Sequence, residues 1–277
     1  MPPTDTASDG SDERETETNG DGERDRNGGA DRDDGSGSDE TPNTDETDQT
    51  VREERSLSPM RRTIANRLQD SYRNAVHVTA SREVGAEALF RAVETANDRL
   101  EADISLVDVV LAALSATLAD HPAFNATFED RTHRTYEEHN VGVAVDIEAG
   151  LVAPVLRDVG SKSLAEIATE RRRLTETVQS GAYTMDDLRG GTFTVTNLGV
   201  LGVDSFTPVI NPPEVAILGI GRTRERACRG DDGLEFRREL TYDLSFDHRI
   251  VDGADAARFL GTLADYTEGA ERFAPDG

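Results

Sequence analysis

The sequence of 277 residues contains one cysteine, Cys228, and no tryptophan. A single thiol excludes an internal disulfide and a thiolate metal cluster, so we interpret Cys228 as a buried or incidental thiol. Lysine is equally rare, because Lys162 is the only one and the other basic side chains are arginines. Acidic residues number 55 against 30 basic ones, a formal net charge of −25. Such an anionic chain with so little lysine predicts a halophilic protein, whose self-repulsion is screened by a cytoplasm of high salt.

Two other absences exclude classes of partner. The chain has no basic stripe that could release counterions from phosphates, so we expect no nucleic acid partner. No apolar run approaches the roughly 20 residues that span a bilayer, and the N-terminus lacks the regions of a signal peptide. We therefore expect no membrane partner and a cytoplasmic location.

One short basic run, Arg171 to Arg173, interrupts the acidic pattern. It falls in a predicted helix beside several glutamates, which are Glu166, Glu170 and Glu176. Opposite charges three or four residues apart on a helix attract one another, so we expect a solvated, salt-bridged helix face.

Neither a metal site nor a nucleotide-phosphate loop is predicted. Gly219-Ile-Gly221 lacks the third glycine of a dinucleotide-binding loop, and Gly199 to Gly202 lacks the lysine that completes a P-loop. Four histidines lack the i, i+4 helical spacing of a zinc site, and we interpret them as structural or surface residues. They are His77, His121, His133 and His139.

The chain divides by composition. Residues 1–55 contain 19 acidic residues, 6 arginines and hardly any apolar side chains. Such a segment buries too little apolar surface to offset the entropy of ordering, so we expect a disordered acidic tail. Residues 56–277 keep a net charge of −12 and carry the periodic apolar pattern of a folded domain.

Helices and strands alternate irregularly in the folded region, which is typical of an α/β (mixed α+β) two-layer sandwich: a mixed sheet covered by helices on one face. A strongly apolar helix after Ser105, with Asp108 completing a capping box, is expected to be central and buried. The predicted helices are 59–74, 86–100, 106–118, 163–180 and 254–266. The predicted strands are 77–84, 140–147, 151–155, 192–196 and 215–220. A hairpin that turns at 230–233 is predicted to end at His248. Residues 148–150 are predicted to be a three-residue connection between the strands 140–147 and 151–155.

The most informative stretch is Ser245 to Gly253, where a strand delivers His248 to a sharp turn. Upstream, Leu240 to Phe246 alternates apolar and polar residues as a half-buried strand does. Downstream, apolar residues recur at helical spacing. An imidazole between strand and helix is held rigidly while it faces a cleft, and Asp252 beside Gly253 can fold back to fix the turn.

Four motifs in register carry a resemblance to a known family. The segment Asp247 to Gly253 resembles the His-x-x-x-Asp-Gly signature of the dihydrolipoyl acyltransferases, the core components of 2-oxo-acid dehydrogenase complexes. Three further stretches resemble the same family in the same order: 60–68, 150–157, and 191–199 continuing into 206–219. The resemblance spans roughly 58–273. It implies an acyltransferase catalytic domain over 56–277 with a chloramphenicol acetyltransferase-like fold.

The resemblance implies acyl transfer between dihydrolipoamide, or a related thiol, and coenzyme A. A thiol with a pKa of about 8.5 needs a base, and neutral imidazole is suitable near pH 7, so we expect His248 to be the general base. By resemblance, the family's hydroxyl residue falls on Thr196, which would donate to the oxyanion. Asp252 either orients the imidazole or anchors the turn through a basic partner such as Arg67, and we favour anchoring. No residue is assigned to coenzyme A.

The resemblance also implies partners. The family's active site lies between subunits of a trimer, so we expect a homotrimer, possibly a larger core, together with dehydrogenase components. Members usually carry a lipoyl domain with a modified lysine, but Lys162 leads into a predicted helix, so we expect the lipoyl group on a separate polypeptide. Two functions stay open, an active acyltransferase and a non-catalytic trimeric assembly core that recruits partner subunits. The joint presence of His248, Thr196 and Asp252 favours the first.

Overall fold

The computed structural model describes residues 50–148, 150–230 and 233–275. The expected acidic tail therefore lies almost entirely outside the described residues. Residues Arg55–Gly277 form one compact unit, to which the following description applies.

Five α-helices occur within the described residues of this unit, and all five lie close to their predicted positions. They are α1 (Pro59–Asn74), α2 (Glu87–Arg99), α3 (Leu106–Asp120), α4 (Leu164–Gln179) and α5 (Gly253–Glu268). Local capping explains where several begin: the Ser58 hydroxyl accepts a hydrogen bond from the Arg61 amide at 3.2 Å, and Ser105 with Asp108 forms the predicted capping box. None of the helices in the described ranges is both long enough and apolar enough to cross a membrane.

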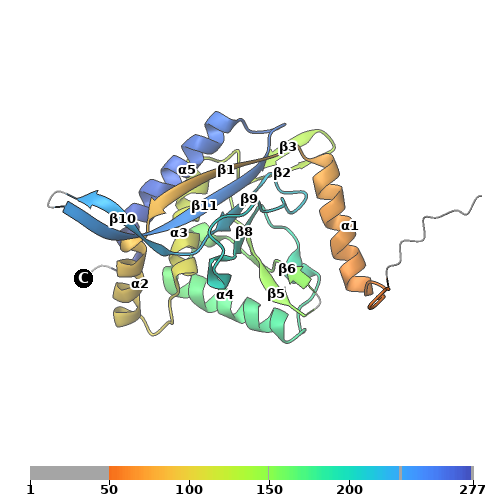
Figure 1. Ribbon diagram of the computed structural model, residues 1–277, viewed down its shortest axis with the longest axis horizontal. Helices are drawn as coiled ribbons and strands as arrows, with labels where there is room; N and C mark the ends of the chain where they lie inside the picture. The colour runs from red at the N-terminus through yellow and green to blue at the C-terminus, as the bar shows by residue number, and fades with distance from the viewer. Residues whose placement is uncertain (1–49, 149, 231–232, 276–277) are drawn as a thin grey trace, which may run out of the picture. The chain divides into compact units, whose positions relative to one another are not determined.

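Seven strands form the main sheet, and its order confirms the mixed α/β fold (Figure 1). The order is β1 (His77–Gly85), β11 (Gly233–Asp247), β9 (Ala216–Ile220), β8 (Phe193–Asn197), β4 (Val141–Val143) and β7 (Val155–Leu156), with β10 (Arg224–Gly230) also paired to β11. The pairs β9–β8 and β8–β4 are parallel and the others antiparallel. Two small sheets pair β2 (Ala126–Glu129) with β3 (Thr132–Thr135), and β5 (Val145–Ile147) with β6 (Gly150–Val152). Short 3₁₀ turns cover Val159–Ser161, Asp186–Leu188, Gly199–Leu201 and Ala270–Phe273.

The strand predicted over 140–147 is wrong as a single element. The chain leaves the main sheet at Ala144, whose amide donates to the Val195 carbonyl at 2.9 Å, and continues as a separate hairpin of β5 and β6. Ile147 pairs with Gly150, so the connection has two residues rather than the predicted three. Gly150 has a φ of +133°, and a Cβ there would lie 2.7 Å from Nη1 of Arg61, so glycine is needed where α1 crosses the hairpin.

The hydrophobic core lies between the sheet and the helices. Along β11, Leu240, Tyr242, Leu244 and Phe246 are all at most 2% exposed. The alternate residues Asp243 and Ser245 are fully buried as well, so the prediction of a half-buried strand is wrong: β11 is covered on both faces here. Helix α3 is buried on nearly every side and packs against α2, α4 and α5, as predicted for the central helix. Alternate residues of β11 therefore point to the opposite face of the sheet.

The interpretation of Arg171 as part of a solvated helix face is wrong. Its guanidinium donates from Nε to Oδ1 of Asp108 at 2.5 Å and from Nη2 to Oδ2 at 3.0 Å, and Asp108 is fully buried in the first turn of α3. Arg172 pairs with Asp103 rather than with a glutamate of its own helix. A buried carboxylate needs a charged partner, and Arg171 reaches it from a different helix.

Candidate active site

His248 lies immediately after β11, at the start of the turn that leads into α5. Its backbone amide donates to the Val76 carbonyl at 2.9 Å, and its imidazole lies 5.8 Å from the Phe246 ring. The neighbouring Asp247 carboxylate accepts a bidentate pair of hydrogen bonds from Arg249, at 2.9 Å from Nε and 2.5 Å from Nη2. The backbone on both sides of His248 is therefore fixed, while its side chain remains 40% exposed.

Asp252 lies beside the imidazole and begins α5. Its Oδ1 is 3.8 Å from Nδ1 of His248, which is too long for a hydrogen bond. Asp252 is the N-cap of α5 and forms a capping box with Asp255, whose carboxylate accepts from the Asp252 amide at 3.2 Å. Asp252 is thus placed both to hold the helix start and to face the histidine.

Arg67, the basic partner suggested for Asp252, contacts different residues. Its Nε donates to Oδ1 of Asn211 at 3.1 Å, and its Nη2 donates to the Pro212 carbonyl at 2.6 Å. The suggestion of an Arg67–Asp252 contact is therefore wrong within one chain. The physical reason is that α1 lies against the segment before β9 rather than against the start of α5.

Thr196 lies on β8 and lines a cavity of about 330 Å³. Thr196 is buried, with an exposed fraction of 7%. The cavity is otherwise largely apolar; its other lining residues include Leu68, Leu198, Phe206, Pro208 and Ile217. A hydroxyl that donates within a mostly apolar cavity can stabilise developing negative charge more strongly than it could in water.

The register of the sheet separates Thr196 from His248. Thr196 pairs with Gly219, which pairs with Asp243, and His248 follows Asp243 by five residues along β11. At about 3.3 Å per residue and about 4.8 Å per strand, the two Cα atoms of one chain lie roughly 19 Å apart. His248 does not line the cavity that contains Thr196. One chain by itself therefore does not bring the two side chains onto the same substrate atom.

A buried carboxylate holds the wall of the Thr196 cavity. Asp243 accepts hydrogen bonds from the Ser205 hydroxyl at 2.8 Å, the Phe206 amide at 2.9 Å and the Ser81 hydroxyl at 2.5 Å. The Phe206 ring packs on Gly219, where a Cβ would lie only 2.8 Å from the ring. These contacts tie the segment containing Phe206 to the sheet and so define the cavity.

A second buried carboxyl, that of Glu214, was not predicted from the sequence. It accepts from the Thr194 hydroxyl at 2.5 Å and from the Asn211 amide at 3.0 Å. Burial raises the pKa of Glu214 to about 7, although its hydrogen bonds with Thr194 and Asn211 and the charge of Arg67 act in the opposite direction. The only signal in the sequence was its place in the motif 206–219, which indicates a family but no burial.

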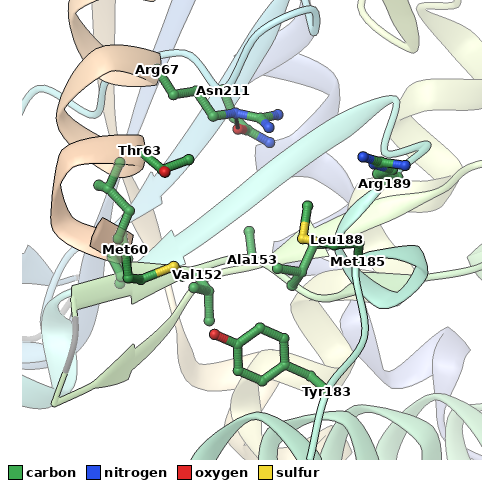
Figure 2. A pocket seen from close by; sticks show the side chains of 12 residues that line it. Met60, Thr63, Arg67, Val152, Ala153, Tyr183, Met185, Leu188, Arg189 and Asn211 are labelled. Carbon is green, nitrogen blue, oxygen red and sulfur yellow. Dashed lines mark hydrogen bonds between the residues drawn. The ribbon is translucent and has the colours of Figure 1, made fainter. Parts of the chain in front are cut away.

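A second cavity of about 210 Å³ adjoins the first, and Figure 2 shows the side chains around it. Its walls come from α1, from the β5–β6 hairpin and from the segment 183–189. The two cavities share six lining residues: Ile64, Arg67, Leu151, Val152, Ala153 and Asn211. The two cavities therefore adjoin along these residues, and Thr196 lines only the first.

The other histidines make local hydrogen bonds. Nδ1 of His139 lies 2.7 Å from the Ser115 hydroxyl, and Nε2 of His121 lies 2.8 Å from the Thr262 hydroxyl. Burial lowers the pKa of both, which favours the neutral ring. Within residues 50–148, 150–230 and 233–275, no three histidine, cysteine or acidic side chains group as metal ligands.

The sequence of this chain is similar to those of known acyltransferase components. The chain is 34% identical over 215 residues to a dihydrolipoyllysine-residue acetyltransferase component of the pyruvate dehydrogenase complex from Zymomonas mobilis, covering 76% of this chain and 49% of the relative. It is 37% identical over 234 residues to a dihydrolipoyllysine-residue succinyltransferase component of the 2-oxoglutarate dehydrogenase complex from Bartonella vinsonii, covering 82% and 57%. The chain thus spans about half the length of these relatives.

Solved structures and a family model agree with these relatives. A dihydrolipoamide acetyltransferase of Azotobacter vinelandii superposes with a TM-score of 0.75 at 30% identity, covering 80% of this chain and 93% of that one. That enzyme was studied for the roles of a serine, a histidine and an asparagine in its catalytic mechanism. The cubic core of a pyruvate dehydrogenase multienzyme complex gives a TM-score of 0.77 at 30% identity, covering 84% and 98%. The family model of the 2-oxoacid dehydrogenases acyltransferase (catalytic domain) matches residues 49–274. The chain therefore belongs to this acyltransferase family.

Proposed function

We propose that this protein transfers an acyl group between coenzyme A and the thiol of dihydrolipoamide, with His248 as general base and Thr196 as oxyanion donor. One observation supports these roles most directly. In the Azotobacter enzyme, the serine precedes the histidine by 52 positions and the asparagine follows it by four. The same intervals separate Thr196 from His248 and His248 from Asp252 in this chain.

The proposed chemistry uses each side chain in one step. The imidazole of His248 removes the proton from the attacking thiol, and the resulting thiolate attacks the thioester carbonyl. Negative charge then develops on the carbonyl oxygen, where the Thr196 hydroxyl donates a hydrogen bond. The intermediate collapses with loss of the second thiolate, which recovers the proton from the imidazolium. Asp252 acts as a positioning residue through the start of α5.

We further propose that the site is completed by a second subunit of a homotrimer, because the two side chains of one chain lie roughly 19 Å apart. Exposed apolar side chains near Thr196 and His248 support a subunit contact in the region between these two residues. Leu68 and Val209 line the Thr196 cavity, while Val76 supplies the carbonyl that binds the His248 amide. Exposed apolar patches of this kind mark protein interfaces. The patch comprises Leu68, Tyr72, Val76, Val78 and Val209.

The proposal extends to the other components of the complex. The lipoyl group would be presented by a separate lipoyl-domain protein, and the acyl group would come from a dehydrogenase component. The names of the relatives support this, since they are components of complexes that act on pyruvate or 2-oxoglutarate.

The experiment measures acyl transfer from acetyl-CoA and succinyl-CoA to free dihydrolipoamide with the purified chain at high salt. We expect transfer with at least one donor. A chain that is trimeric but transfers neither group would support the non-catalytic assembly core instead.

Mixing two inactive variants tests the shared site. The His248→Ala and Thr196→Val chains are unfolded together in equal amounts and refolded, so that they form mixed trimers. Half of the chains keep His248 and the other half keep Thr196, so about a quarter of the interfaces pair an intact His248 with an intact Thr196. We expect about a quarter of wild-type activity to return, whereas each variant refolded alone stays inactive. Failure of the mixed trimers to regain activity would contradict a site built from two subunits.

A further inference from the structure

The charge of the two adjoining cavities differs in sign from that of the chain. Acidic residues outnumber basic ones by 55 to 30 in the sequence, yet the charged residues that line the cavities are both arginines, Arg67 and Arg189. An unselected surface of this protein would carry mostly carboxylates. A cationic lining within a strongly anionic molecule indicates a place where an anionic group is bound.

Arg189 is held where it can reach this cavity. It follows the 3₁₀ turn Asp186–Leu188, and Nη2 of Arg157 donates to the carbonyls of Asp186 and Arg189 at 3.0 and 2.7 Å. Gly190 has a φ of +75°, and a Cβ there would lie 2.7 Å from Nη1 of Arg157. Arg157 thus fixes the backbone of the segment, while the Arg189 side chain extends to the cavity (Figure 2).

Arg67 lies on the other side of the cavity and is only partly used by the protein. Its hydrogen bonds to Asn211 and Pro212 occupy two of the five donors of a guanidinium. The nearby carboxyl of Glu214 is buried and has a pKa raised to about 7, so near neutral pH it offsets only part of the Arg67 charge. The Tyr183 side chain also lines this cavity and adds a possible hydroxyl donor.

Arg67 lines the Thr196 cavity itself, and Arg189 lines the cavity beside it. A ligand that filled both cavities would follow a path from Thr196 to Arg189. Arg67 lines both cavities, and the shared walls from Ile64, Leu151 and Val152 are apolar. A ligand suited to this path has a reactive thioester at one end, an uncharged middle and an anionic group at the other end. A lipoyl arm has no anionic end, so it does not match.

We propose that Arg67 and Arg189 bind an anionic group carried by the thioester, substrate or product, whose carbonyl lies at Thr196. This inference rests on the proposed acyl transfer and adds the part of the substrate that the path recognises. Two sources share the chemistry: the phosphates of coenzyme A, and a carboxylate at the end of a dicarboxylic acyl chain. Arginine suits both groups because its planar guanidinium donates to two oxygens at once.

The test compares Arg189→Gln and Arg67→Gln with wild type at one fixed salt concentration. Calorimetry gives the Kd for coenzyme A and for pantetheine, which lacks the nucleotide phosphates. Kinetics give kcat/KM for succinyl-pantetheine and acetyl-pantetheine. Loss of one charge-assisted contact is expected to weaken the recognised anion about tenfold or more. Two ratios are compared: the Kd for coenzyme A over that for pantetheine, and kcat/KM for succinyl-pantetheine over that for acetyl-pantetheine. Arg62→Gln, on the same helix as Arg67 but outside both cavities, is the matched control and should change neither ratio.

Each outcome bears on the proposal. A higher Kd for coenzyme A with an unchanged Kd for pantetheine assigns the arginines to the phosphates. A selective loss of succinyl over acetyl transfer assigns them to a carboxylate. If Arg189→Gln leaves both ratios at their wild-type values, the proposal is overturned. A wild-type chain that transfers no acyl group would contradict the proposed function, while the coenzyme A titration would still test the arginines.

Discussion

The two proposed halves of the active site differ in how completely one chain builds them. Thr196 is 7% exposed in a cavity whose wall is tied to the sheet by buried Asp243. His248 is 40% exposed, at the end of a strand, and the Asp252 carboxylate beside its ring is 3.8 Å away. One chain thus completes the cavity around the proposed oxyanion donor, whereas the proposed base is presented on a surface. This difference favours an enzyme in which subunit assembly determines the surroundings of His248 more than the surroundings of Thr196.

Removing the base should have the largest effect. His248→Ala is expected to reduce acyl transfer by about 10²- to 10⁴-fold, because a positioned general base contributes about that much. The fold should be retained, since the amide of residue 248 still donates to Val76. Acyl-transfer rates and the thermal midpoint measured on the same samples check both expectations. His133→Ala, at an exposed histidine on β3, serves as control; a His248→Ala chain with more than about a tenth of wild-type activity would exclude the assigned role.

Removing the hydroxyl from the pocket should have a smaller effect. Thr196→Val keeps the shape of the side chain but not its donor, and we expect kcat to fall about 10²-fold from loss of one oxyanion donor. Thr196→Ser keeps the donor and should retain most of the activity. Steady-state kinetics measure kcat and KM separately. A Thr196→Val effect confined to KM would show that the hydroxyl binds substrate equally in ground and transition states.

Changing Glu214 should alter stability more than chemistry. Its folded pKa of about 7 lies above the ordinary value of 4.5, so the folded state retains a proton that the unfolded state releases. The stabilisation is present below about pH 4.5 and is lost as the pH rises through about 7, a change of about 3 kcal/mol. Glu214→Gln cannot titrate, so its stability relative to wild type should increase between pH 5 and pH 8.

Denaturant unfolding at a series of pH values at constant salt measures this difference. Glu129→Gln, at an exposed position at the end of β2, should show no such trend relative to wild type. A Glu214→Gln chain whose relative stability does not change with pH would mean that the carboxyl is ionised in the fold throughout the range.

Much of the fold could be predicted because it depends on local interactions. The helix after Ser105 begins at a capping box of residues three apart, and the alternation from Leu240 to Phe246 puts the apolar side chains on one face of the strand, where they join the core. The split at Ala144 could not be predicted, because the apolar pattern of 140–147 suits one strand as well as two short ones. Pairing with β6 and β8 decides between them.

The sequence by itself therefore determined the helices and most of the strands, the family resemblance and the identity of His248, Thr196 and Asp252 as candidates. The tertiary structure alone decided which charges meet and how far apart the candidates lie. Arg171 reaches Asp108 across 63 positions, and Arg67 contacts Asn211 rather than Asp252. Strand order and register set these distances, and they arise from packing among segments far apart in the chain, which no local pattern records.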